Sequence, residues 1–465
     1  MMSVPSTDAT RALSAAEVIA QEPTREALAN ALGDLRARMQ RSGQWGAGQM
    51  AGRRWPVACV SLEITQRCNL DCTLCYLSES SEAVRDLPLE EVFRRIDMIV
   101  AHYGPGTDVQ VSGGEPTLRR RDELIAIVLR LKQRGLRASL FTNGIKATRA
   151  LLIELARAGL TDVAFHVDMT QQRVGFRSEA DLNPLRVEYI ERARGLGLGV
   201  FFNTTVHAAN ANDVAMLAAF FKAQADVVRF VSFQLQAETG RGVLGARAAA
   251  ITNDSVAAQL CAGVGTPLHF NTLLAGHHDC NRSAVVLVIN GRAYDAFEDE
   301  AFIQRFMQAT ALLRIDRGTQ WRAARSLVKA ALSRPALTLA SLRWVGAFAW
   351  QARYDLIKAR GRVHKLTLFT HNFMDACGLN RERIDACVFM AVTQHGPMSM
   401  CAYNARRDNY LLQPLFTSKG EWQPLGAPQA ESQPQPIKFL KGRAREVWLQ
   451  ARRDAARVEH EQAGA

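Results

Sequence analysis

The sequence predicts an α/β fold: a partial (β/α)6 barrel of the TIM type, followed by a helical and cysteine-rich C-terminal extension. Six strand-like segments alternate with helical segments between residues 57 and 235. Strands joined by crossovers of this length run parallel, and their nearly continuous apolar runs suit a sheet buried on both faces. Unusual polar residues and cysteines also gather where the strands end, as they do at the functional rim of barrels and doubly wound sheets. An open doubly wound sheet fits the same pattern.

Each element follows from local sequence. The strands are rich in β-branched and aromatic residues, and they are expected at 57–65, 107–115, 136–144, 161–168, 198–206 and 227–235. The helices have apolar residues at helical spacing, and the first two close on a glycine. They are expected at 87–104, 121–135, 147–159, 183–197 and 212–224.

Four parts make up the predicted chain. Residues 1–54 form an N-terminal helical segment, and residues 55–250 form the barrel core. Residues 251–417 form the extension, with a hairpin at 276–297 and a basic helical region at 300–360. Residues 418–465 form a polar linker and a charged helical tail.

Composition narrows the class of protein. The 465 residues are 48% hydrophobic and 22% charged, as in an ordinary globular protein. The net charge of +12 suits anionic lipid or phosphorylated partners, but no nucleic-acid signature accompanies it, so nucleic acid is not expected as a partner. Nine cysteines, three of them clustered, do not resemble a secreted disulfide framework. The N-terminus has no secretory h-region, and the apolar stretch 334–350 contains Arg343. We expect a cytoplasmic location.

Three cysteines in "TQRCNLDCTLCYL" raise the question of a metal site. The CxxxCxxC spacing of Cys68, Cys72 and Cys75 lets three thiolates converge from one loop. Structural zinc usually takes four ligands in paired motifs, which are absent nearby. Iron–sulfur clusters normally take four cysteines, so three would leave one iron open to an external ligand.

"CNLDCTLC", followed after the next strand by "SGGEPTL", resembles the radical S-adenosylmethionine (radical SAM) superfamily. The resemblance implies that Cys68, Cys72 and Cys75 hold a [4Fe–4S] cluster whose fourth iron binds SAM. It implies that Ser112, Gly113, Gly114 and Glu115 contact the SAM amino group. It also implies a reducing partner such as flavodoxin or ferredoxin.

Other residues at the expected rim are candidates for cofactor or substrate contacts. They are Asn143 and Asp168, which follow predicted strands, Asn203, which lies within the fifth strand, and Gln234, which lies near the end of the sixth. Any one of them would also serve as a cap or turn former. His166 is expected to be a packed strand residue.

A second group of cysteines offers four ligands for an auxiliary [4Fe–4S] cluster: Cys280, Cys377, Cys387 and Cys401. The turns "GHHDC" and "GPMSMC" deliver the first and last of them. Cys261 is an alternate ligand, and Cys59 lies inside a strand and is expected in the core. Buried free cysteines are common, so each residue alone would also suit a packing role.

The blocks "SFQLQAETGRG", "GHHDC" and "GPMSMCAYN" look similar to the radical SAM group of archaeal tetraether lipid synthase and pterin-methylating proteins. That group and the basic, tryptophan-containing region 318–365 favour a lipid or lipid-linked substrate, with hydrogen abstraction at an unactivated carbon, and contact with a membrane surface. The same region would equally suit a helical layer packed on the barrel. The alternatives are a peptide or small heterocycle as substrate and, in another class, a non-catalytic metal-binding protein.

Overall fold

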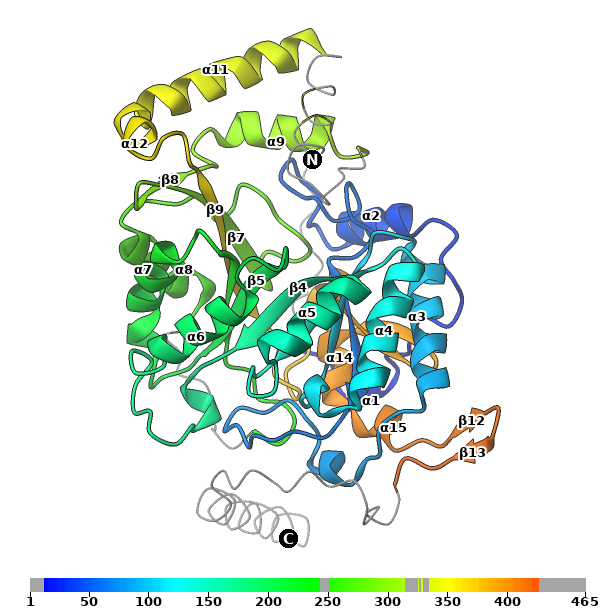
Figure 1. Ribbon diagram of the computed structural model, residues 1–465. Helices are drawn as coiled ribbons and strands as arrows, with labels where there is room; N and C mark the ends of the chain where they lie inside the picture. The colour runs from blue at the N-terminus through cyan, green and yellow to red at the C-terminus, as the bar shows by residue number, and fades with distance from the viewer. Residues whose placement is uncertain (1–11, 243–250, 314–324, 326–327, 329–333, 426–465) are drawn as a thin grey trace, which may run out of the picture.

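The computed structural model describes residues 12–242, 251–313, 325, 328 and 334–425, and a single large sheet organises them (Figure 1). Within these residues the sheet has eleven strands in the order β11-β10-β1-β2-β3-β4-β5-β6-β9-β7-β8. The α/β class and the partial barrel are therefore confirmed.

The six predicted strands form the centre of the sheet, all parallel. They are β1 (Cys59–Thr65), β2 (Asp108–Gly113), β3 (Arg137–Thr142), β4 (Leu160–His166), β5 (Gly199–Val206) and β6 (Val228–Leu235). The predicted helices cover their outer face as α3 (Leu89–Tyr103), α4 (Arg121–Gln133), α5 (Arg149–Ala158), α6 (Asn183–Ala193) and α7 (Val214–Ala223) (Figure 1). α8 (Asn253–Val264) packs beside α7.

The C-terminal extension continues this sheet at both edges. β9 (His364–Asn372) pairs parallel with β6, and the hairpin of β7 (Asn281–Ile289) and β8 (Arg292–Asp295) follows it. On the other edge β10 (Phe389–Thr393) pairs parallel with β1, and β11 (Gly396–Ser399) follows it antiparallel. The predicted boundary at residue 250 separates chain segments that share one sheet, and it stays a prediction.

The two edges of the six-stranded core meet through side chains of β9 and β10. The ring of His371 lies 4.3 Å from that of Phe389, and the ring of Phe369 lies 6.2 Å from it, between centroids. Only residues 373–388 connect these strands, with α13 (Arg381–Asp385) among them. This segment therefore connects the strand at one edge of the six-stranded core to the strand at the other edge.

Side chains of the core strands alternate between two environments. Val200, Phe202, Val231 and Phe233 are almost completely buried, and the ring of Phe202 packs 5.1 Å from that of Phe221 in α7. The intervening residues of β5 and β6 point to the inner side and stay half-buried. The inner side of the curved sheet is therefore covered less completely than the side that faces the helices.

Several elements lie outside the barrel. Short helices α1 (Ala15–Ile19) and α2 (Ala31–Arg41) come from the predicted N-terminal segment. α9 (Glu300–Ala309), α11 (Pro335–Gln351) and α12 (Arg353–Lys358) stand at the end opposite to residues 66–78, the loop that carries Cys68, Cys72 and Cys75 (Figure 1). α14 (Met400–Ala405), α15 (Asp408–Leu411), β12 (Leu415–Thr417) and β13 (Gly420–Trp422) end the described chain. No helix among the described residues combines the length and hydropathy needed to cross a bilayer. The predicted charged tail helix and much of region 318–333 lie outside the described residues.

Candidate functional site

The cysteine loop, residues 66–78, follows the carboxyl end of β1. Its middle is held against the loop that follows β4, because the backbone N–H of Thr73 donates to the carbonyl of Thr170 at 2.9 Å. Burial raises the pKa of the Cys68 thiol to about 12, with Glu115 and Cys75 adding to the effect. Burial and then Cys75 and Cys68 likewise raise the pKa of Cys72. Cys75 thus lies close enough to the other two thiols to raise their pKa values, and thiolates at these positions would be stabilised by a positive partner.

The spacing of the sulfurs discriminates between kinds of metal centre. Tetrahedral zinc with Zn–S bonds of about 2.3 Å places its sulfurs about 3.8 Å apart. No three cysteine sulfurs of the described chain lie within 4.8 Å of one another; the group that does is His277, His278 and Asp279. The sulfurs of Cys68, Cys72 and Cys75 are therefore not arranged as they would be around a single tetrahedral zinc ion.

Arg241 supplies the positive charge beside the cysteine loop. Its guanidinium hydrogen-bonds the Cys75 sulfur, and its backbone N–H donates to the carbonyl of Leu77 at 2.8 Å. Burial opposes its charge, but Cys75 and then Asp71 outweigh burial and raise the pKa of Arg241. Sequence reasoning missed this residue, because nothing in "ETGRG" marks an arginine as a neighbour of a loop more than 160 positions earlier.

Gly113 and Gly114 lie directly on the backbone at the start of the cysteine loop. A Cβ at Gly113, where φ is +127°, would sit 2.0 Å from the carbonyl oxygen of Thr65. A Cβ at Gly114 would sit 2.2 Å from that of Arg67. The N–H groups of Gly114 and Glu115 donate to those same two carbonyls, at 2.9 and 2.8 Å. Only glycine permits this approach, which fixes the glycine pair beside the cysteines.

The other residues of this motif are held by the protein itself. Glu115 is fully buried, and its carboxylate accepts hydrogen bonds from Thr142 Oγ1 (2.7 Å), the Asn143 N–H (2.7 Å) and Thr117. The Ser112 hydroxyl pairs with that of Ser61 at 2.6 Å. The carboxylate thus anchors the end of β3 to the glycine pair.

Asn143 joins the end of β3 to the cysteine loop, because its side-chain amide donates to Asn69 Oδ1 at 2.7 Å. The backbone N–H of Asn143 donates to the Glu115 carboxylate. Burial raises the pKa of Glu115, although the hydrogen bonds that its carboxylate accepts act in the opposite direction. The sequence-predicted residues from two strand ends are thereby brought together around the loop.

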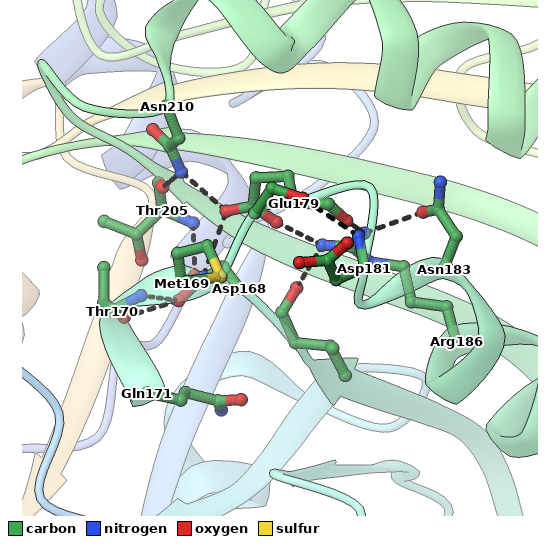
Figure 2. A network of polar contacts seen from close by, with 12 residues as sticks. Asp168, Met169, Thr170, Gln171, Glu179, Asp181, Asn183, Arg186, Thr205 and Asn210 are labelled. Atoms are coloured by element: carbon green, nitrogen blue, oxygen red, sulfur yellow. Dashed lines mark hydrogen bonds and ion pairs between the residues drawn. The ribbon is translucent and has the colours of Figure 1, made fainter. Parts of the chain in front are cut away.

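Asp168 organises the ends of β4 and β5 (Figure 2). Its carboxylate accepts hydrogen bonds from the N–H groups of Thr170 (3.0 Å) and Thr205 (2.7 Å), and it pairs with His166 Nε2 at 2.6 Å. Burial alone would raise the pKa of Asp168, but His166 and these donors outweigh it and hold the pKa well below its usual range. Burial would lower the pKa of His166, yet Asp168 raises it. His166 is therefore a paired residue on the inner side of the sheet and more than a packed strand residue.

A buried ion pair lies beside Asp168 (Figure 2). The Glu179 carboxylate pairs with the guanidinium of Arg186, and both side chains are fully buried. Glu179 also accepts from the Met169 N–H at 3.0 Å and from the Asn210 amide at 2.8 Å. These contacts fix the loop after β4, on which the cysteine loop rests. The sequence offered no signal for this pair, since its members look like ordinary surface residues.

Asn203 and Gln234 point to the inner side of the sheet from β5 and β6. Asn203 is level with His166, and Gln234 is level with His371 of β9.

Deeper in the barrel, four half-buried phenylalanines form a continuous row of ring contacts. Their centroids are 5.3 Å apart for Phe201 and Phe230, 5.4 Å for Phe230 and Phe369, and 6.2 Å for Phe369 and Phe389. The mouth of the barrel is polar, and one inner wall is aromatic.

The second group of cysteines comes together only in part. Cys280, Cys387 and Cys401 line one cavity at the seam between β9 and β10, while Cys377 is exposed and lies outside its lining. Burial raises the pKa of Cys401, with Cys387 and Cys280 adding to it. Cys261 packs against the barrel core from α8, and Cys59 is buried in β1. Cys387 adjoins the amino end of β1, so the two cysteine sites lie at opposite ends of that strand.

Comparison with known proteins agrees with this geometry. Residues 62–221 match the model of the radical SAM superfamily. A 7,8-dihydro-6-hydroxymethylpterin dimethyltransferase of Methanocaldococcus jannaschii is 29% identical over 188 residues, covering 39% of this chain and 37% of that protein. A PqqA peptide cyclase of Bradyrhizobium diazoefficiens is 32% identical over 154 residues, covering 32% and 40%. The chain thus matches well under two thirds of the length of these curated relatives.

Among solved structures, the FeFe-hydrogenase maturase HydG from Carboxydothermus hydrogenoformans is similar at a TM-score of 0.36 and 14% identity, covering 50% of this chain and 56% of that one. Streptococcus suis SuiB bound to S-adenosylmethionine follows at 0.32 and 15%, covering 39% and 41%. Similarity at this level indicates nothing about substrate. The match to the family model coincides with the strands that carry the cysteine loop and the glycine pair, so residues 62–221 are similar to the radical SAM superfamily in the part of the chain that holds the site.

Proposed function

We propose that this protein is a radical SAM enzyme, with Cys68, Cys72 and Cys75 as ligands of a [4Fe–4S] cluster. The observation that carries the proposal is the contact between the cysteine loop and the glycine pair. Gly113 and Gly114 lie directly against the backbone that begins this loop, so close that a Cβ on either residue would overlap the carbonyl oxygen of Thr65 or Arg67. When bound, the cluster and SAM would supply a 5′-deoxyadenosyl radical that removes a hydrogen atom from carbon, at the expense of one electron from a reducing partner such as flavodoxin or ferredoxin.

The residues of the chain would bind and orient these groups. Arg241 would donate its hydrogen bond to the Cys75 sulfur and balance the negative charge of the thiolates. Backbone groups of the pair Gly113–Gly114 would face the amino group of SAM. Asn143, Asn203 and Gln234, at the polar mouth, would contact SAM or substrate, and the pair of His166 and Asp168 would keep a polar, charged wall there.

The inner wall of phenylalanines favours an apolar substrate. Phe201, Phe230, Phe369 and Phe389 are half-buried, so part of the surface of this row remains available to a ligand. A hydrocarbon chain against these rings would bury apolar area at about 25 cal/mol per Å². We therefore propose hydrogen abstraction from an unactivated carbon of a lipid or lipid-linked substrate, leading to carbon–carbon coupling or methylation.

Helix α11 supports a contact with a membrane surface. Its inner face packs through Trp344, whose ring lies 5.8 Å from that of Phe302. Its outer face leaves Leu339, Leu342 and Trp350 exposed by 62%, 64% and 70%. Apolar residues and tryptophan beside arginines are typical of helices that lie on a membrane. Because α11 stands at the end opposite to the cysteine loop, it would hold the protein at the surface without forming the entrance to the barrel.

A second candidate is modification of a small heterocycle or a peptide. The relative from Methanocaldococcus jannaschii is named as a pterin dimethyltransferase, and the one from Bradyrhizobium as a peptide cyclase. The phenylalanine wall would also stack on a planar ring. The aliphatic outer face of α11 is the observation that favours the lipid.

The test is anaerobic incubation with SAM and a chemical reductant, with 5′-deoxyadenosine as the readout. Production should rise on addition of host lipid extract and should vanish in Cys68→Ala, Cys72→Ala or Cys75→Ala. Stimulation by a pterin or peptide fraction instead would select the second candidate. Zinc in place of iron, or unchanged activity in the cysteine variants, would overturn the proposal and favour a non-catalytic metal protein.

Membrane contact is tested separately by flotation with vesicles of anionic lipid. The double variant Leu342→Ser, Trp350→Ser should bind less. Leu129→Ser serves as a matched control, because Leu129 is an exposed leucine (42%) on α4 of the barrel wall. Equal binding of both variants would refute a role for α11.

A further inference from the structure

The cavity at the seam of β9 and β10 is lined by three cysteines. It also contains one histidine whose nitrogens are free to bind a metal. Cys280 precedes β7, Cys387 precedes β10, and Cys401 lies in the first turn of α14. His371, near the end of β9, lines the same cavity. Its residue exposure is only 7%. Residues from four separate segments thus converge on one place that the sequence alone did not connect.

The ring of His371 is fixed in orientation by aromatic neighbours. It lies 3.9 Å from the ring of Phe373 and 4.3 Å from that of Phe389, between centroids, with tilts of 31° and 41°. Rings on both sides leave its edge, which carries the two nitrogens, as the part that can bind. In the described part of the chain neither nitrogen of His371 has a hydrogen-bond partner. Neither nitrogen is a buried atom left without a partner, so the edge of the ring reaches the space of the cavity.

His277 lines the same cavity but is already engaged. Its Nδ1 accepts a hydrogen bond from the N–H of Asp279 at 3.1 Å, and its Nε2 lies 3.6 Å from the Glu382 carboxylate. The predicted fourth cysteine is not available either, because Cys377 is exposed and outside the cavity lining. His371 is therefore the donor that remains beside the three cysteines.

We propose that a second cluster is held by Cys280, Cys387, Cys401 and the imidazole of His371, and that Cys377 is not a ligand. This inference rests on the expectation from the sequence that the second group of cysteines holds an auxiliary cluster. Imidazole ligation in place of thiolate raises the reduction potential of an iron–sulfur centre. The Nε–H of Arg383, which donates to the Cys280 sulfur at 3.3 Å, acts in the same direction. The second cluster would therefore accept an electron more readily than one bound by four cysteines.

The experiment uses the full chain with Cys68, Cys72 and Cys75 changed to Ser, so that only the second cluster contributes iron. After anaerobic reconstitution we expect about four irons per chain. Pulsed EPR of the reduced cluster should show a directly coupled nitrogen that changes to ¹⁵N when the protein is labelled with ¹⁵N-histidine. In the same background, Cys377→Ala should keep both the iron and the nitrogen coupling.

His371→Cys should keep the iron, lose the nitrogen coupling and shift the reduction potential downward. Because this variant restores a fourth ligand, it tests the inference without depending on whether His371→Ala folds. Four irons without a histidine coupling, or loss of iron in Cys377→Ala alone, would overturn the ligand set while leaving the second cluster in place. A background that binds no iron would overturn both. Neither result would affect the first cluster, whose ligands are absent from this background.

Discussion

Replacing Gly114 by alanine should detach the glycine pair from the cysteine loop. The added Cβ would lie 2.2 Å from the carbonyl oxygen of Arg67 and 2.7 Å from that of Gln66, both backbone atoms that cannot rotate away. Ordinary contact begins at 3.4 Å, so the two segments must separate by about 1.2 Å. Overpacking of this kind costs about 1–3 kcal/mol. Weakening the two hydrogen bonds between the segments adds about 1 kcal/mol, and we expect a total loss of about 2–4 kcal/mol.

The assay is urea unfolding of Gly114→Ala beside iron analysis and SAM binding of the reconstituted protein. Gly46→Ala is the matched control, because a Cβ there meets nothing within 4 Å and its φ is ordinary. We expect the control to behave as wild type, and Gly114→Ala to lose stability and to bind SAM and iron more weakly. An unfolding free energy within about 0.5 kcal/mol of wild type, together with full iron and SAM binding, would refute the steric reasoning.

Three further predictions concern side chains around the same site. Arg241→Met removes a charged hydrogen bond to the Cys75 sulfur, so redox titration should show a lower potential for the first cluster, and an unchanged potential would contradict this. In His166→Gln the histidine paired with Asp168 is lost; Asp168 raises the pKa of that histidine in the folded protein. The stabilisation by the protonated His166 is complete below the unfolded pKa of about 6.5, and it is lost as the pH rises through the raised, folded value. Thermal midpoints of wild type should therefore exceed those of the variant most at pH 6 and least at pH 9, and a constant difference would speak against the pair. Tyr76→Phe removes a 2.6 Å hydrogen bond to the glycine pair and should weaken SAM binding without loss of iron, which equilibrium binding to the reconstituted protein would show.

The barrel core was predictable because its signals are local. Each strand from β1 to β6 has its apolar run, and each following helix has its periodicity, so the elements lie within a few residues of their predicted limits. The extension was less predictable. Nothing in the sequence says that β9 and β10 extend opposite edges of one sheet, because pairing between distant segments depends on the whole fold. The fourth ligand predicted from cysteine spacing alone, Cys377, is the one that the cavity at this seam leaves out.

The sequence by itself was enough to predict the iron–sulfur and SAM chemistry, because short motifs indicate it. The spacing of Cys68, Cys72 and Cys75 lies within one loop, and the glycines of "SGGE" lie at one strand end, so both patterns can be recognised without knowledge of the fold. Only the tertiary structure decided which distant side chains lie beside the cysteines of each group. Arg241 reaches Cys75, and His371 joins Cys280, Cys387 and Cys401, because folding brings together segments that are up to about 170 positions apart. Such contacts arise from packing of the complete barrel, and no local pattern records them.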